Sequence, residues 1–305
     1  MKVSGGLDAS RLTNVLDDYL IKEEKFQPNL KCLTGRKGPN EISFFHRDKS
    51  VCILLHINRH CGFQPETFAL AVNLLDRFLS VVKANPKYLP CISISCMFLA
   101  AKMVEEDEAI PTAGNLIGVS GLSCTPSDLL RMERIILDKL GWNLSAVTPL
   151  QLLQVFHALC VSKGYLDNCP VSEHLHHITL KLEELLCNHK FTFFKPSTLA
   201  LSLLSCEISS LTNVWIEATI MLQDMAQIAD SELSYSRIDV LQYFNFLIAN
   251  QCEKFLSAFP EESVFPFNSH VSPVCQIIQA GDKKIFIGPS NHLALTHEES
   301  WKETD

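Results

Sequence analysis

Histidine and cysteine are the side chains of this sequence that most readily suggest chemistry. The spacing of the candidate ligands matches no standard zinc motif, and no Cys-x-x-Cys pair occurs in the chain. We therefore predict no metal site and no cofactor, and we interpret these histidines as exposed helix residues. The candidates lie in one stretch: His174, His176, His177, Cys187 and His189.

Other catalytic patterns are also missing from the sequence. It has no Gly-rich phosphate loop and no nucleophile elbow, so we predict that the protein is not an enzyme. The sequence has twelve cysteines, and those such as Cys91, Cys96, Cys160 and Cys206 stand singly in helical patterns, where free cysteine behaves as a small hydrophobe. Together with an N-terminus that does not resemble a signal peptide, this predicts a reducing compartment, the nucleus or the cytoplasm or both.

One charged residue stands out by its position. Residues 91–101 are apolar at nearly every place, so a helix there must be walled in by other helices. Lys102 follows directly, and the acidic run 105–108 comes next. A buried helix that brings one cation to the surface is suited to presenting a contact rather than to forming the floor of a catalytic pocket.

Hydrophobic periodicity predicts an all-α protein with four regions. An N-terminal helix and linker occupy 1–45, and a five-helix unit occupies 46–147. A second five-helix unit occupies 148–250 and opens with a Thr-Pro pair, as does the last helix of the first unit. Proline, serine and asparagine then interrupt the pattern, which predicts a largely irregular, flexible tail over 251–305.

Composition excludes two classes of partner. The 305 residues carry a net charge of −8, which argues against a nucleic-acid-binding protein because such proteins need a dense basic surface. No apolar stretch runs for 18 residues without polar interruption, so we predict no membrane span.

Four segments in order resemble the cyclin box, over roughly residues 46–149. The second helical set is similar to the carboxy-terminal cyclin fold, with less specific motifs. Details of the match most resemble the atypical cyclins of the I and G types, with the I type as the nearest expectation. The matching segments are Glu66–Leu79, Phe98–Lys102 with Glu105-Glu106, Arg131–Leu137, and Leu140–Leu144 followed by Thr148-Pro149.

The resemblance implies a kinase-binding site. In cyclins, a lysine at the end of the third helix and a glutamate of the fifth grip the backbone of the kinase; here these are Lys102 and Glu133. Charge-assisted hydrogen bonds of this kind are directional and strong. The alternative is a surface ion pair that contributes little energy. The family's apolar positions around the pair correspond to Met103, Leu137, Trp142 and Leu144.

The resemblance also implies a buried structural pair, Arg47 with Asp76. In cell-cycle cyclins the residues around that arginine form an apolar patch that docks Arg-x-Leu substrates. Here the arginine is followed by Asp48 and Lys49, and Ile53 replaces a tryptophan. We expect these charges to prevent a dry groove, so conventional Arg-x-Leu docking is doubtful.

The function implied is that of a regulatory subunit that binds and activates a cyclin-dependent protein kinase in cell-cycle or related signalling control. The alternative is a non-activating adaptor with the same fold, which recruits a phosphatase or another partner and restrains growth. A DNA-binding initiation factor of the same fold is disfavoured by the acidic charge.

Overall fold

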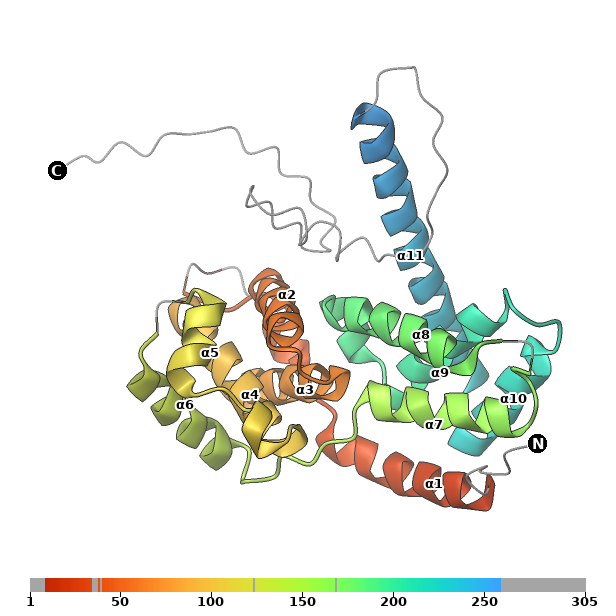
Figure 1. Cartoon of the computed structure of the whole chain (residues 1–305), viewed down its shortest axis with the longest axis horizontal. Coiled ribbons are helices and arrows are strands. Elements are labelled where there is room, and N and C mark those ends of the chain that lie inside the picture. Colours follow the sequence, from red (N-terminus) through yellow and green to blue (C-terminus); the bar gives the residue numbers. More distant parts are fainter. Residues whose placement is uncertain (1–8, 35–37, 39, 123, 168, 259–305) are drawn as a thin grey trace.

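The computed structural model describes residues 9–34, 38, 40–122, 124–167 and 169–258, and within these ranges every regular element is helical (Figure 1). The predicted architecture, an N-terminal helix followed by two five-helix units, is confirmed. The first unit comprises α2 (Phe44–Cys61), α3 (Pro65–Val81), α4 (Leu89–Val104), α5 (Ala113–Ser120) and α6 (Pro126–Lys139). The second comprises α7 (Pro149–Ser162), α8 (Val171–Leu186), α9 (Pro196–Ile208), α10 (Trp215–Ala226) and α11 (Asp230–Ala258).

Helix α4 forms the centre of the first unit. It packs against α2, α3, α5 and α6, and all ten residues from Ile92 to Ala101 are buried. This burial explains the composition of the segment. Pro86–Val104 is long and apolar enough to cross a membrane by those criteria alone, but 61% of it is enclosed by the bundle. Polar residues, among them Lys87, Ser93, Ser95 and Lys102, interrupt the segment, and its place in the fold is that of a core helix.

Helix α9 has the same place in the second unit. It packs against α7, α8, α10 and α11, and it is buried along almost its whole length. Helix α11 continues to Ala258, so the prediction of an irregular chain is wrong for residues 251–258. The rest of that predicted tail, residues 259–305, lies outside the described residues.

The N-terminal helix α1 (Ala9–Phe26) packs on the second unit, against α7, α9 and α10 (Figure 1). Its buried Glu23 accepts hydrogen bonds from the backbone N–H and the hydroxyl of Ser197, at 2.9 and 2.7 Å. Ser197 lies in the first turn of α9, whose free N–H groups need acceptors. Glu23 thus caps α9 from a distant part of the sequence. The short η1 helix (Leu30–Leu33) then returns the chain to α3 of the first unit.

A carboxyl group marks the joint between the two units. Thr148 is the N-cap of α7, and its hydroxyl donates to Glu66 at 2.9 Å from Oε2. Glu66 lies in the first turn of α3, where the helix dipole favours a negative charge. Burial outweighs this effect and raises the pKa of Glu66 to about 7. The folded protein therefore holds a proton on this group at mildly acidic pH.

This proton makes the stability of the joint depend on pH. Between about pH 4.5 and 7 the folded state binds more protons at Glu66 than the unfolded state, so stability falls as the pH rises. Glu66→Gln keeps the acceptor for Thr148 and removes the ionisation. We expect urea unfolding to show that the variant's stability relative to wild type increases from pH 4.5 to pH 7.5. An unchanged difference at the two pH values would contradict this assignment.

Candidate functional site

The structure brings Lys102 and Glu133 together. The ammonium Nζ of Lys102 lies 2.5 Å from Oε1 of Glu133 and 4.1 Å from the centroid of the Phe98 ring. Lys102 is 39% exposed and Glu133 is 12% exposed, so the pair is open to solvent on one side. The lysine nitrogen has three donors and the carboxylate has a second oxygen. Both groups therefore retain capacity for hydrogen bonds to another molecule.

Helices α4 and α6, which carry this pair, run parallel. A residue in the middle of α4 contacts one near the start of α6, and a residue near the end of α4 contacts one further along α6. The hydroxyl of Ser95, in the middle of α4, donates to the carbonyl of Leu129 in α6 at 3.3 Å.

Helix α4 ends just after Lys102, and Glu105 then accepts a hydrogen bond from the backbone N–H of Gln64 at 2.7 Å and another from the hydroxyl of Thr67. Glu105 thus caps α3 and fixes the chain directly after the lysine.

The four predicted apolar neighbours divide into two groups. Met103 and Trp142 are 49% and 69% exposed, whereas Leu137 and Leu144 are buried in the hydrophobic core. The latter two therefore belong to the core and do not ring the site at the surface. Leu130, which was not predicted, is 45% exposed one turn before Glu133 in α6. Its spacing of three residues from Glu133 was the signal that could have identified it. We call Lys102, Met103, Leu130 and Glu133 the α4–α6 face.

Trp142 has an uncommon backbone conformation. It follows Gly141 after the end of α6, and both residues have a positive φ, 59° for Trp142 and 61° for Gly141. Its backbone N–H donates to the carbonyl of Leu137 at 2.9 Å, which holds the turn in place. A bulky residue in the left-handed region costs free energy. Trp142 nevertheless adopts this conformation, and most of its side chain remains exposed to solvent.

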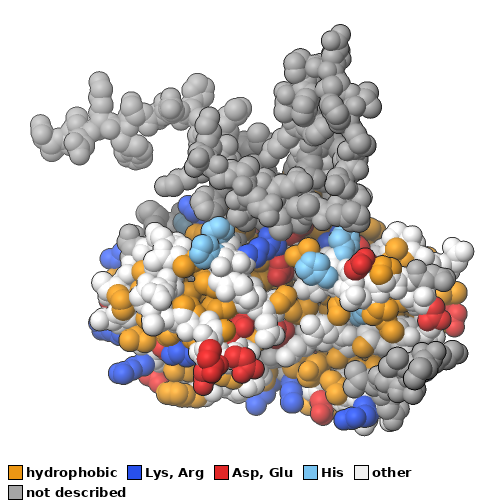
Figure 2. Space-filling view, in the orientation of Figure 1, with side chains coloured by type: hydrophobic (Ala, Val, Ile, Leu, Met, Phe, Trp, Pro, Cys, Tyr) orange, Lys and Arg blue, Asp and Glu red, His pale blue; other side chains and the backbone are white. Residues whose placement is uncertain are grey.

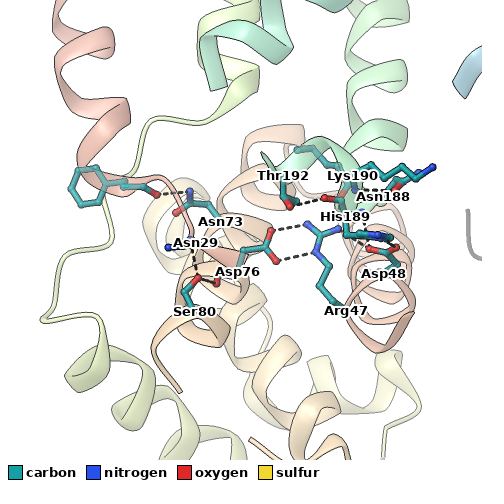
Figure 3. Close-up of polar contacts among 12 residues, drawn as sticks. Asn29, Arg47, Asp48, Asn73, Asp76, Ser80, Asn188, His189, Lys190 and Thr192 are labelled. Atoms are coloured by element: carbon teal, nitrogen blue, oxygen red, sulfur yellow. Dashed lines mark hydrogen bonds and ion pairs between the residues drawn. The ribbon is translucent and has the colours of Figure 1, made fainter. Parts of the chain in front are cut away.

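A second cluster of charged groups is buried where the two units meet (Figure 3). Arg47 in α2 forms a bidentate pair with Asp76 in α3, with Nε–Oδ1 and Nη2–Oδ2 distances of 2.9 and 2.7 Å. Its Nη1 donates to Asp48 and to the carbonyl of Leu186 at the end of α8. Burial would lower the pKa of the guanidinium, but the two carboxylates outweigh it and raise that pKa. All three charged side chains are almost inaccessible to solvent.

Asp48 corrects one sequence expectation. It was expected to place a charge on the docking surface, but it is buried and accepts two hydrogen bonds from His189 of the second unit. The distances are 2.9 Å to the backbone nitrogen and 2.6 Å to Nδ1. Asp48 shares a helix face with the buried Leu55, seven residues later, and this periodicity could have revealed it. Of the charged pair, only Lys49 is exposed.

The histidine and cysteine candidates are dispersed by the fold. His189 belongs to the Asp48 contact, and His174 shares a 3.0 Å hydrogen bond with His157. Cys187 shares a thiol hydrogen bond with Cys52. His174 is buried and His189 is half-buried, so the interpretation of these histidines as exposed is wrong for those two residues. Within the described ranges, no group of three or more His, Cys, Asp or Glu side chains is placed to hold a metal ion.

Charge on the surface is mixed. On the side of the molecule shown in Figure 2, lysine and arginine side chains are scattered among acidic and apolar ones and do not gather in one basic area. This distribution agrees with the net charge of −8 and offers no extended track for a phosphate backbone on that side.

The buried cluster yields a stability prediction. Arg47→Met leaves Asp76 and Asp48 without their cation, which we expect to lower the free energy of unfolding by about 3–5 kcal/mol. The matched control is Lys49→Met, two residues along the same helix but exposed, for which we expect a change below about 0.5 kcal/mol. Denaturant unfolding measures both values, and equal effects would show that the cluster has no special structural role.

Residues 14–145 match the family model described as the cyclin N-terminal domain. The chain is 34% identical over 256 residues to Cyclin-G1 of Homo sapiens, covering 81% of this chain and 85% of that protein. It is 38% identical over 242 residues to Cyclin-G2 of Homo sapiens, covering 76% and 68%.

The fold is similar to the crystal structure of a viral cyclin from herpesvirus saimiri. The TM-score is 0.61 at 18% identity, covering 74% of this chain and 96% of that one. The relatives above are of the G type, so the expectation that the I type is nearest is not supported.

Proposed function

Since this chain belongs to the cyclin family, whose members are regulatory subunits rather than enzymes, we propose that it binds a cyclin-dependent protein kinase through the α4–α6 face. One observation carries the proposal. A solvent-open pair of opposite charges, Lys102 and Glu133, stands on two rigid helices with exposed Met103 and Leu130 beside it. Charged groups bordered by apolar ones are typical of the residues that dominate a protein interface.

The chemistry of the pair suits backbone recognition. Lys102 can donate to a carbonyl of the partner while Glu133 accepts from an N–H, and charge-assisted hydrogen bonds fix both distance and direction. Because α4 is enclosed by other helices, Lys102 loses little backbone freedom on binding. Trp142 adds an exposed aromatic side chain on a fixed turn, which is consistent with a second anchor for the same partner.

Activation of the kinase would follow from selective binding. A partner that exists in active and inactive conformations shifts toward the one that this rigid face binds more tightly. We propose that the face holds the active arrangement of the kinase, as the family resemblance implies. The proposal includes a nuclear or cytoplasmic location, which the free cysteines of the described residues support independently of the site.

A non-activating adaptor is the second candidate, and one observation favours it. At the start of α2, where substrate docking would occur, Arg47 and Asp48 point into the buried cluster and Lys49 is exposed. The exposed charge of Lys49 on this surface disfavours the burial of a substrate leucine. A chain of this kind would bind a kinase without presenting substrates to it in the conventional way.

The kinase proposal is tested by exchanging the two charges. The double variant Lys102→Glu/Glu133→Lys retains an ion pair within the chain, but it presents a donor where the partner needs an acceptor, and the reverse. We expect the exchange to change stability by less than about 1 kcal/mol and to remove binding to a panel of purified cyclin-dependent kinases. Kinase activity in the same panel separates activator from adaptor.

The matched control is Asp138→Lys/Lys139→Asp, an exchange of two exposed charges near the end of α6. We expect it to leave kinase binding unchanged. If the Lys102/Glu133 exchange also left binding unchanged, the pair would be a surface ion pair and the proposed interface would be wrong.

Substrate docking is tested separately. We expect an Arg-x-Leu peptide to show no measurable binding to this chain in fluorescence anisotropy, while it binds a cell-cycle cyclin used as the positive control. The physical reason is that Lys49 and the half-buried Ile53 cannot enclose the leucine in a dry groove. Micromolar binding to this chain would contradict the account.

A further inference from the structure

Two free thiols face each other at the end of the first unit that is remote from Lys102. Cys91 lies in the first turn of α4, and Cys124 immediately precedes Thr125, the N-cap of α6. Their sulfur atoms are 3.3 Å apart, with Cys124 donating to Cys91. A disulfide needs about 2.05 Å, so an approach of about 1.2 Å would join them. Both residues are partly accessible, which allows a small oxidant to reach the pair.

The position of these thiols connects them to the α4–α6 face. Cys91 at the start of α4 contacts Cys124 in the loop that leads into α6, and the two parallel helices then contact each other at Ser95 and Leu129 and at Lys102 and Glu133. Lys102 lies eleven residues beyond Cys91, about 16 Å along the helix. A covalent link at the first contact would prevent the two helices from sliding or separating, and it would thereby fix the register that brings the charged pair together.

We propose that Cys91 and Cys124 are an oxidation site that forms a reversible disulfide with an oxidant of the peroxide class. The sulfur of Cys124 attacks one peroxide oxygen, the O–O bond breaks, and a sulfenic acid and water form. The sulfur of Cys91 then attacks that sulfenic sulfur, the S–S bond forms, and the S–O bond breaks with loss of a second water. Two thiols are oxidised by two electrons, and one peroxide is reduced to two waters. A low-molecular-weight thiol reverses the reaction by exchange.

The order of the steps follows from burial. Desolvation raises the pKa of the Cys91 thiol to about 12, so this thiol is protonated at neutral pH and is the poorer first nucleophile. Cys124 lies in the loop before α6, where a sulfur can move toward its partner without distorting a helix. Cys52 and Cys187 also share a thiol hydrogen bond, but Cys187 is buried and is therefore less accessible to an oxidant.

Peptide mapping tests the site in the full chain, without a kinase, so its outcome does not depend on the proposed function. Trypsin releases Tyr88–Lys102, which contains Cys91 and Cys96, and Met103–Arg131, which contains Cys124. After treatment of the reduced protein with hydrogen peroxide, we expect these two peptides to be linked with the loss of two hydrogens. Dithiothreitol should separate them again.

Variants assign the bond. Cys91→Ser and Cys124→Ser should each abolish the link, and Cys96→Ala, which alters the buried thiol in the same peptide, should retain it. The melting temperature of the wild-type chain should rise on oxidation and return on reduction, with no such shift in Cys91→Ser. Two results would overturn the proposal: a link that depends on Cys96, or no link at peroxide concentrations that convert the exposed Cys32 to a trappable sulfenic acid.

Discussion

The enclosure of α4 on every side is the constraint on which the rest of this structure depends. Ten consecutive residues of that helix, Ile92 to Ala101, are removed from water. The burial of each large aliphatic side chain among them stabilises the folded state by roughly 1.5–3 kcal/mol. Four helices must surround such a segment, which determines the arrangement of the first unit. The helix leaves the core at Lys102, so its position and direction are set by the packing beneath it. The same arrangement recurs around α9.

Polar groups then join the two units. The guanidinium of Arg47 is shared between two carboxylates and a carbonyl of the second unit, and Asp48 reaches His189 there. Replacing such groups by apolar ones need not destabilise a protein, but removing one partner leaves a buried charge uncompensated. The cluster therefore specifies how the units meet rather than supplying much net energy. Two further carboxyl groups contact the first residues of distant helices. Thr148 at the start of α7 donates to Glu66, and Ser197 at the start of α9 donates to Glu23.

Much of this architecture could be predicted from sequence, for physical reasons that differ between elements. The helices of both units were predictable because their apolar residues recur with the helical period and their ends carry Thr-Pro or Gly signals, as at Thr125 and Gly121. The pairing of Lys102 with Glu133 was implied only by the family resemblance, since the residues are 31 positions apart. Asp48 was misplaced because a carboxylate is normally exposed, and only its distant partner His189 explains its burial. Glu105 and Glu23 act as helix caps through tertiary contacts that have no local sequence signal.

The central claim is that the α4–α6 face binds a kinase, and calorimetric titration of the single variants Lys102→Ala and Glu133→Ala tests it most directly. Each variant removes one charge-assisted hydrogen bond to the partner, which is worth about 1.5–3 kcal/mol. The account predicts that each weakens kinase binding by about 10- to 150-fold while the free energy of unfolding changes by less than about 1 kcal/mol. Binding constants equal to that of the wild type, measured on folded variants, would contradict it.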